Sequence, residues 1–313
     1  MEIIPAGTAQ EIEPAVAPAA RKYRAASMSR STKRAIELNW RGFLAWAEQK
    51  GLLPLPCEPE TLEAYLIELA ERGRKVATVE QARYAINARH KLAGLPGPGD
   101  SQLVKTVMAG IRRSLGTRQR QSEALTIDHI TAISFRNDEK GSRDKALLMV
   151  AVCGGFRRSE LAGIRVEHVQ SSPGGLRIFL ERSKGDQEAR GNWVDIVRSV
   201  TPRHCPVEAL RKWMVLMGRN DGPLFPSIRK GGKISDRAVS PYAVNLIVKW
   251  AARQCGLDPA EFSGHSTRAG CATFLLDRGV SLNIVANHLR HKSMNTTRRY
   301  DRNATAKALA GVY

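Results

Sequence analysis

SGHSTRAGCATFLLDRGVSLNIVANHLRHKSMNTTRRYDR, residues 263–302, places His265 and Arg268 three residues apart at the start of an amphipathic helix. His291 follows further along, and Tyr300 comes nine residues after it. A histidine and an arginine three apart share one face of a helix, so both can reach a single phosphate from one rigid element. The stretch therefore predicts a helical segment that carries an oxyanion site.

Tyr300 lies in the most basic part of this stretch, beside Arg298, Arg299 and Arg302. Clustered positive charge holds a polyanion near the phenol, which makes Tyr300 a candidate nucleophile. Taken alone, the position of Tyr300 favours an amphipathic surface tyrosine, because most tyrosines are structural. The interpretation therefore depends on other residues of the chain.

A second motif, GGFRRSEL, covers residues 154–161. The apolar run 146–152 before it is helical in character, the two glycines break that helix, and a new helix begins near Ser159. Arg157 lies at this break, where the two flanking helices would hold it in a fixed position, although it could simply cap a helix. Glu160 lies three residues further on and could orient the basic groups or form an ordinary helix salt bridge.

A β-hairpin is expected between these two motifs. Apolar and polar residues roughly alternate in 176–186 and again in 193–196, on either side of a polar turn that contains Gly185. Lys184 lies near the tip, where it could donate a proton or remain a solvated surface lysine.

Six of these residues occur in the order and context typical of the tyrosine recombinase (phage integrase) family: Arg157, Lys184, His265, Arg268, His291 and Tyr300. The chain resembles this family from about residue 29 to its end. Residues 58–73, 94–101 and 107–113 are similar to amino-terminal stretches of its Cre-like members. The resemblance implies a site-specific DNA recombinase acting as a tetramer on two inverted-repeat sites, through a 3′-phosphotyrosine intermediate and a Holliday junction.

The resemblance also implies a role for each residue. Tyr300 attacks the scissile phosphate, and Arg157 and Arg268 bind its nonbridging oxygens. Lys184 protonates the leaving 5′-oxygen, His265 accepts or relays the tyrosine proton, and His291 donates to a phosphate oxygen. Neither a cofactor nor a metal is expected. A type IB topoisomerase-like nicking-closing enzyme and a noncatalytic DNA-binding regulator are the alternatives.

Candidate DNA contacts lie outside this set. The stretch 235–238 resembles a family segment that sends an arginine to guanine, so Arg237 is the first candidate for reading sequence. In the amino-terminal part, Gln81 and Arg83 are candidates for base or phosphate contact, and Arg112 and Arg113 for phosphate contact.

Composition agrees with a nucleic-acid partner. The 313 residues carry a formal net charge of +19 that is spread along the chain. Charge alone would also suit a ribosomal or membrane-surface protein. The five cysteines have no metal-ligand or disulfide spacing, and no apolar run is long enough for a membrane span. We expect a bacterial or phage-encoded protein of the cytoplasm, associated with the nucleoid and with no membrane partner; accessory proteins stay unknown.

The expected fold is mainly α, with an amino-terminal helical bundle and an α-rich catalytic domain that holds a small antiparallel β-sheet. The domains are a disordered tail (1–28), a DNA clamp (29–115), a polar linker or interhelical loop (116–123) and the catalytic domain (124–313). Helices are expected at 31–50, 60–71, 78–93, 101–115, 206–217, 239–255, 265–278 and 281–289. The third begins at the capping-box pattern Thr78–Gln81, and the sixth is opened by 235–238. By resemblance, the apolar residues of 304–312 could form a carboxy-terminal helix that packs against a neighbouring subunit.

Overall fold

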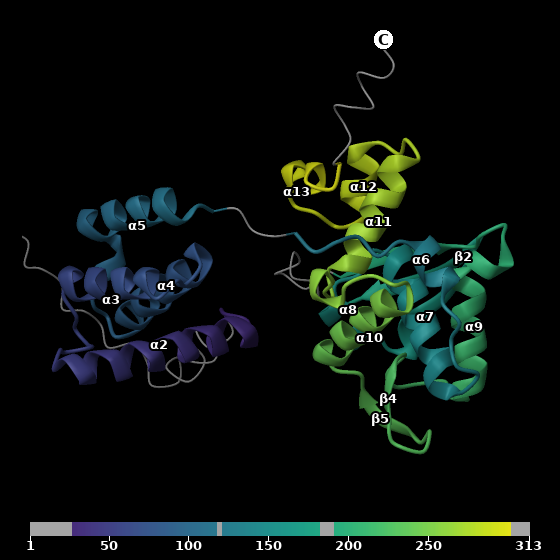
Figure 1. Cartoon of the computed structure of the whole chain (residues 1–313). Coiled ribbons are helices and arrows are strands. Elements are labelled where there is room, and N and C mark those ends of the chain that lie inside the picture. The colour runs from purple at the N-terminus through teal and green to yellow at the C-terminus, as the bar shows by residue number, and fades with distance from the viewer. Residues whose placement is uncertain (1–26, 118–120, 182–190, 302–313) are drawn as a thin grey trace, which may run out of the picture. The chain divides into compact units, whose positions relative to one another are not determined.

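The computed structural model describes residues 27–117, 121–181 and 191–301, and its chain divides into two units, 1–119 and 120–313 (Figure 1). The division falls inside the segment 116–123 that the sequence suggested as a linker. Lys184, most of the tail 1–28 and the apolar segment 304–312 lie outside the described residues. No helix among the described residues is both long and apolar enough to cross a membrane.

The amino-terminal unit is a bundle of helices, drawn in purple and blue in Figure 1. It contains α2 (Arg30–Lys50), α3 (Pro59–Glu71), α4 (Val76–Leu92), the short 3-10 helix η1 (Pro98–Asp100) and α5 (Gln102–Leu115). Its core includes an aromatic cluster in which Tyr65 lies 5.1 Å from Phe43 and 5.0 Å from Trp46, centroid to centroid. These rings bury large apolar areas and fasten α2 to α3.

One helix of this unit begins earlier than the sequence pattern suggested. α4 starts at Val76 with Lys75 as its N-cap, so the capping-box interpretation of Thr78–Gln81 was wrong. Val76 and Val79 are buried, which makes the first turn part of the apolar face. Glu80 forms ion pairs with Arg83 and Arg112 instead of capping the N-terminus of the helix.

The carboxy-terminal unit is built around α7 (Glu139–Cys153), whose residues 146–152 are all buried. A helix that is apolar all round belongs in the centre of a core. α9 (Pro206–Met217), α11 (Ser266–Asp277), α6 (Ile127–Ala132) and strand β3 (Asn192–Val197) pack against it. Trp213 of α9 is fully buried, and its indole N–H donates to the Leu224 carbonyl at 2.8 Å.

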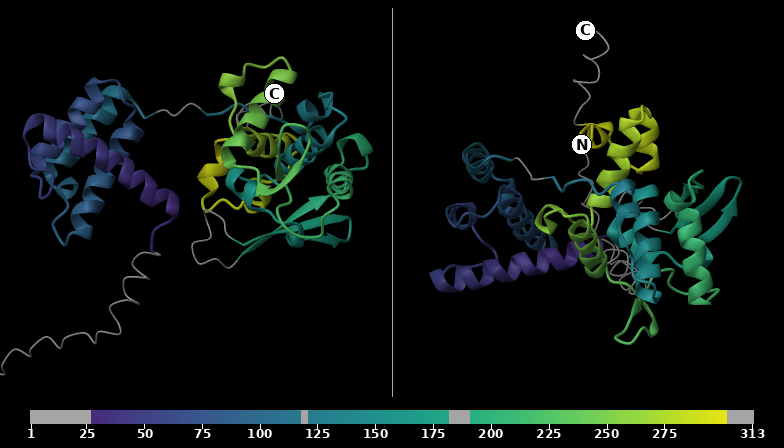
Figure 2. Two further views of the ribbon diagram at one scale, coloured as in Figure 1. Left: turned by 90° about the horizontal axis from the view of Figure 1, so that it is seen from below. Right: turned by 45° about the vertical axis from the view of Figure 1, so that its right-hand side comes forward.

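The predicted hairpin is present as β2 (Gly175–Leu180) and β3, paired antiparallel from Gly175↔Val197 to Leu180↔Asn192. β1 (Val169–Ser172) adds an antiparallel edge strand that was not expected from the sequence pattern. The views in Figure 2 show this sheet to one side of the helices of the unit. The fold class is therefore confirmed as mainly α with a small antiparallel sheet.

A second small sheet corrects another expectation. Residues Ile234–Ala238 form β5, antiparallel to β4 (Pro226–Ile228), and not the opening of a helix. The helix α10 (Pro241–Gln254) begins after Ser240, whose hydroxyl accepts from the backbone N–H of Ala243. The remaining elements are α8 (Arg158–Gly163), α12 (Leu282–His288), α13 (Met294–Arg298) and the 3-10 helices η2 (Val166–His168), η3 (Pro202–His204) and η4 (Pro259–Glu261).

Candidate active site

The turn from α7 to α8 holds Arg157 and Glu160. Gly155 adopts a φ of +54°, which redirects the chain after α7, and Arg157 becomes the N-cap of α8. The carboxylate of Glu160 accepts from the backbone N–H of Arg157 at 2.9 Å and from its Nη1 at 2.6 Å. One acidic side chain thus fixes both the backbone and the guanidinium of Arg157, as in a capping box.

The carboxy-terminal end of α7 collects cationic and polar donors. The last carbonyls of a helix lack intrahelical partners and carry partial negative charge. Here the Cys153 carbonyl accepts from His288 Nε2 at 2.8 Å, and the Gly155 carbonyl just beyond accepts from Arg268 Nη1 at 2.6 Å. The end of α7 therefore attracts residues from α11 and α12.

Arg268 is almost fully buried, with 2% of its surface exposed. Its Nη2 donates to the Leu289 carbonyl, so its guanidinium joins α11 to the segment after α12. Burial, and then the positive charges of Arg157 and Arg290, lower the pKa of Arg268 to about 9. Because that value still lies above neutral pH, Arg268 keeps its charge there.

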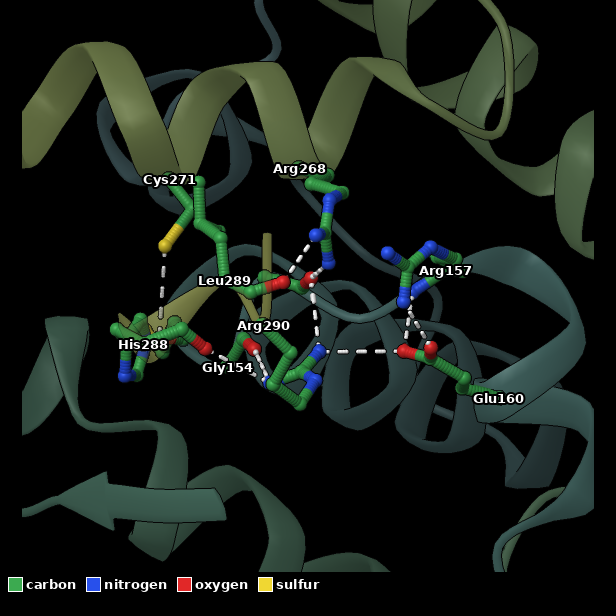
Figure 3. Close-up of polar contacts among 10 residues, drawn as sticks. Gly154, Arg157, Glu160, Arg268, Cys271, His288, Leu289 and Arg290 are labelled. Atoms are coloured by element: carbon green, nitrogen blue, oxygen red, sulfur yellow. Dashed lines mark hydrogen bonds and ion pairs between the residues drawn. The ribbon is translucent and has the colours of Figure 1, made fainter. Parts of the chain in front are cut away.

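Arg290 is a third arginine in this cluster, and no sequence motif indicated it. Figure 3 shows its guanidinium beside Glu160, with Arg157 bonded to the same carboxylate and Arg268 nearby. Arg290 Nη2 lies 3.1 Å from Glu160 Oε2. Three guanidinium groups around one carboxylate leave an excess of positive charge, which is what a phosphate requires.

His291 and Tyr300 lie next to this cluster. Their rings stack with centroids 6.0 Å apart and an interplanar angle of 11°. His291 Nδ1 is 2.8 Å from the hydroxyl of Thr297, which is fully buried. Burial and the charges of Arg268, Arg157 and Arg290 lower the pKa of His291 to about 4, so the imidazole is neutral at pH 7.

Tyr300 also packs against the apolar cluster that α11 and α12 form, which includes Ala272, Val285 and Leu289. That contact fixes the ring while the backbone N–H of Tyr300 bonds to the Thr297 carbonyl at 2.9 Å. The ring of Tyr300 is therefore held by His291 and by the apolar cluster of α11 and α12.

The structure thus brings together five of the residues predicted from the sequence: Arg157, Glu160, Arg268, His291 and Tyr300. His265 is exposed and stands at the N-cap of α11, one turn before Arg268. Lys184 lies in 182–190, and the described strands β2 and β3 flank that segment.

The candidate DNA contacts lie in different settings. Gln81 and Arg113 are exposed on α4 and α5. Arg83 and Arg112 both bond to Glu80 within the bundle, and Arg83 Nη1 also donates to the Gly99 carbonyl at 2.9 Å. Arg237 is exposed on β5.

Comparison with known proteins supplies the family. A sequence model described as the phage integrase family matches residues 115–307. The chain belongs to this family. It is 34% identical over 280 residues to an integrase/recombinase xerD homolog from Selenomonas ruminantium. The aligned region covers 88% of this chain and 82% of that protein. It is also 29% identical to the recombinase cre of Escherichia phage P1, over 82% of each chain.

Among solved structures, the fold is similar to that of lambda integrase in a dimer bound to a COC′ core site. The TM-score is 0.60 at 18% identity, over 92% of this chain and 95% of that one. The family match and the recombinase relatives confirm the family and the class of enzyme predicted from the sequence, a tyrosine-type site-specific DNA recombinase.

Proposed function

We propose that this integrase-family protein cleaves and rejoins DNA at specific sites through a covalent 3′-phosphotyrosine at Tyr300. It acts on two inverted-repeat sites as a tetramer and passes through a Holliday junction. The observation that carries the proposal is the cluster of Arg157, Arg268 and Arg290, followed directly by His291, whose ring stacks on that of Tyr300 with centroids 6.0 Å apart. A basic chain with net charge +19 suits a DNA partner, in a bacterial cell at the nucleoid.

The chemistry follows from the charges and donors. The phenolic oxygen of Tyr300 forms a bond to the phosphorus as the bond from phosphorus to the 5′-oxygen breaks. Arg157 and Arg268 bind the two nonbridging oxygens and stabilise the additional negative charge of the transition state. The phosphotyrosyl bond retains the energy of the phosphodiester, and a 5′-hydroxyl from the partner duplex reverses the step.

Proton transfers complete the step. His265 accepts or relays the phenolic proton, and Lys184 protonates the departing 5′-oxygen. His291 is neutral at pH 7 because the pKa of its ring is lowered to about 4. If the Thr297 hydroxyl donates to Nδ1, then the Nε2–H of His291 is free to donate to a phosphate oxygen.

DNA contacts outside the cleavage site are proposed on both units. Gln81 and Arg113 are exposed and free to approach a duplex, whereas Arg83 and Arg112 would share their charge with Glu80. Arg237 on β5 is the candidate for bidentate contact with guanine.

The test is a selection of cleaved DNA. Duplexes with a random segment and a nick, which lets the short 5′-hydroxyl fragment diffuse away, are incubated with the protein, and adducts that resist denaturation are sequenced. We expect adducts from wild type and from Tyr242→Phe, a control at an exposed tyrosine of the same unit. Tyr300→Phe should bind the selected DNA without forming an adduct, and an adduct from this variant would contradict the proposal.

Two further assays separate the alternatives. A plasmid with two copies of the selected site should yield deletion or inversion products; relaxation alone would indicate a type IB topoisomerase, and binding alone a regulator. For Lys184, the Lys184→Ala variant should regain cleavage on a 5′-phosphorothiolate substrate, whose sulfur needs no proton to leave. A variant that stays inactive on that substrate contradicts the proton-donor role.

A further inference from the structure

Arg290 has an unusual backbone conformation. Its φ of +57° makes it the only non-glycine residue with positive φ within 27–117, 121–181 and 191–301. It follows α12 at the place where a left-handed residue, most often glycine or asparagine, closes a helix. A side chain with a β-carbon raises the free energy of this conformation, and such strain persists where surrounding contacts compensate it.

The side chain of Arg290 supplies these contacts. It is 10% exposed, and its Nη1 donates to the carbonyls of His288 at 2.8 Å and Gly154 at 3.2 Å. Its Nη2 donates to the Gly155 carbonyl and to Glu160 Oε2, both at 3.1 Å. The guanidinium also lies 5.3 Å from the centroid of the buried Phe156 ring. One side chain thus ties the α7–α8 turn to the segment that leads into His291 (Figure 3).

Arg290 shares an acceptor with each of the two other arginines. The Gly155 carbonyl accepts from both Arg290 and Arg268, and the Glu160 carboxylate accepts from both Arg290 and Arg157. Without Arg290, the buried carboxylate of Glu160 would have one hydrogen-bonded cation, Arg157, and the Gly155 carbonyl would be bonded to Arg268 alone. Arg290 therefore adds one positive charge to the cluster that would receive a phosphate.

We propose that Arg290 is a positioning residue for DNA cleavage: it fixes Glu160 and the Gly155 carbonyl so that Arg157 and Arg268 face one phosphate. The inference rests on the proposed function and adds to it a residue that does not itself touch the DNA. Both Nη atoms of Arg290 already donate to protein acceptors. Its effect therefore passes through the two arginines that it orients.

The test compares substitutions of Arg290 with a substitution of Arg143, a control arginine in the same unit. Arg143 on α7 is 5% exposed, donates to Asp144 at 2.8 Å and to the Pro226 carbonyl at 2.9 Å, and lies ten residues before Cys153. Ten residues of α-helix span about 15 Å, so Arg143→Met removes a similar buried ion pair away from the cluster. The probe is the nicked duplex recovered from the random library, at saturating concentration, and the readouts are single-turnover cleavage rate, DNA affinity and thermal unfolding.

We expect Arg290→Met to slow cleavage roughly 10- to 100-fold, by analogy with the loss of residues that orient metal-ligating side chains, with DNA affinity unchanged. Arg143→Met should lower the unfolding temperature but cleave near the wild-type rate. Arg290→Gly provides a second variant if Arg290→Met does not fold, because glycine adopts this φ without strain. Added methylguanidinium should restore part of the cleavage rate of Arg290→Gly by occupying the space of the missing guanidinium.

Two results would overturn the inference: an Arg290→Met or Arg290→Gly variant that cleaves as fast as wild type, or an Arg143→Met variant that slows cleavage as much as Arg290→Met does. A wild-type protein that forms no adduct refutes the proposed function and this inference with it. A wild type that cleaves, with Arg290 variants that cleave equally well, refutes this inference alone.

Discussion

Replacing Glu160 by glutamine tests whether its carboxylate holds the arginine cluster together. The side chain is 2% exposed and pairs with Arg157 at 2.6 Å and with Arg290 at 3.1 Å. Glutamine keeps the size and one acceptor oxygen but removes the charge, which leaves two partly buried guanidinium groups without their counter-ion. Loss of one partner from a buried ion pair costs about 3–5 kcal/mol, and we expect the lower end because glutamine retains a hydrogen bond.

That cost can be measured by unfolding. For a unit of this size, about 3 kcal/mol corresponds to a fall in unfolding temperature of roughly 6–12 °C. Urea unfolding of wild type and Glu160→Gln at pH 7 gives the free-energy difference directly. Cleavage of the selected duplex should also slow, because Arg157 loses the acceptor that orients it. A variant as stable as wild type at pH 7 would refute the reasoning.

The pH dependence of this difference has a definite sign. Burial alone would raise the pKa of Glu160, but Arg290 and Arg157 outweigh it and hold the pKa below the ordinary value of 4.5. A carboxyl whose pKa is lowered on folding stabilises the protein fully above its unfolded pKa and loses that contribution as the pH falls through the folded pKa. The stability gap between wild type and Glu160→Gln should therefore be constant near neutral pH and shrink below pH 4.5. A gap that widens on acidification would contradict the assignment.

Two other substitutions probe the same site. A β-carbon on Gly155 would meet Leu289 Cδ2 at 2.2 Å, whereas one on Gly256, which also has positive φ, meets nothing within 4 Å. Gly155→Ala should therefore lower the unfolding temperature more than Gly256→Ala does, and it should also slow cleavage. Equal unfolding temperatures for the two variants would argue against close packing at Gly155. Thr297→Val should slow cleavage roughly 10-fold or more at unchanged DNA affinity, since His291 loses its Nδ1 partner; a wild-type rate would exclude that role.

Much of the site could be predicted from sequence because its residues lie in local motifs. The two glycines before Arg157 mark the helix break, and the spacing of His265 and Arg268 marks the start of α11. Most long helices also end near residues that their apolar periodicity indicates, as with Lys50 and Met217.

Other features depend on tertiary contacts that sequence does not display. Arg290 looks like any arginine after a short helix, and its burial arises only when the carbonyls of Gly154 and Gly155 meet it in the fold. Ser235 and Asp236 resemble cap residues, but pairing with β4 makes them strand. β1 is largely polar, so no apolar alternation marked it as an edge strand.

The central claim is that Tyr300 is the nucleophile, and the most direct measurement is the identity of the residue bound to DNA. Trypsin cuts after Arg299 and Arg302, so the adduct should release the tripeptide Tyr300-Asp301-Arg302 joined to a nucleotide. We expect mass spectrometry of the trapped wild-type adduct to find a 3′-phosphonucleotide on this peptide. A nucleotide found on a peptide that contains Tyr242 or another tyrosine, with Tyr300 unmodified, would contradict the account.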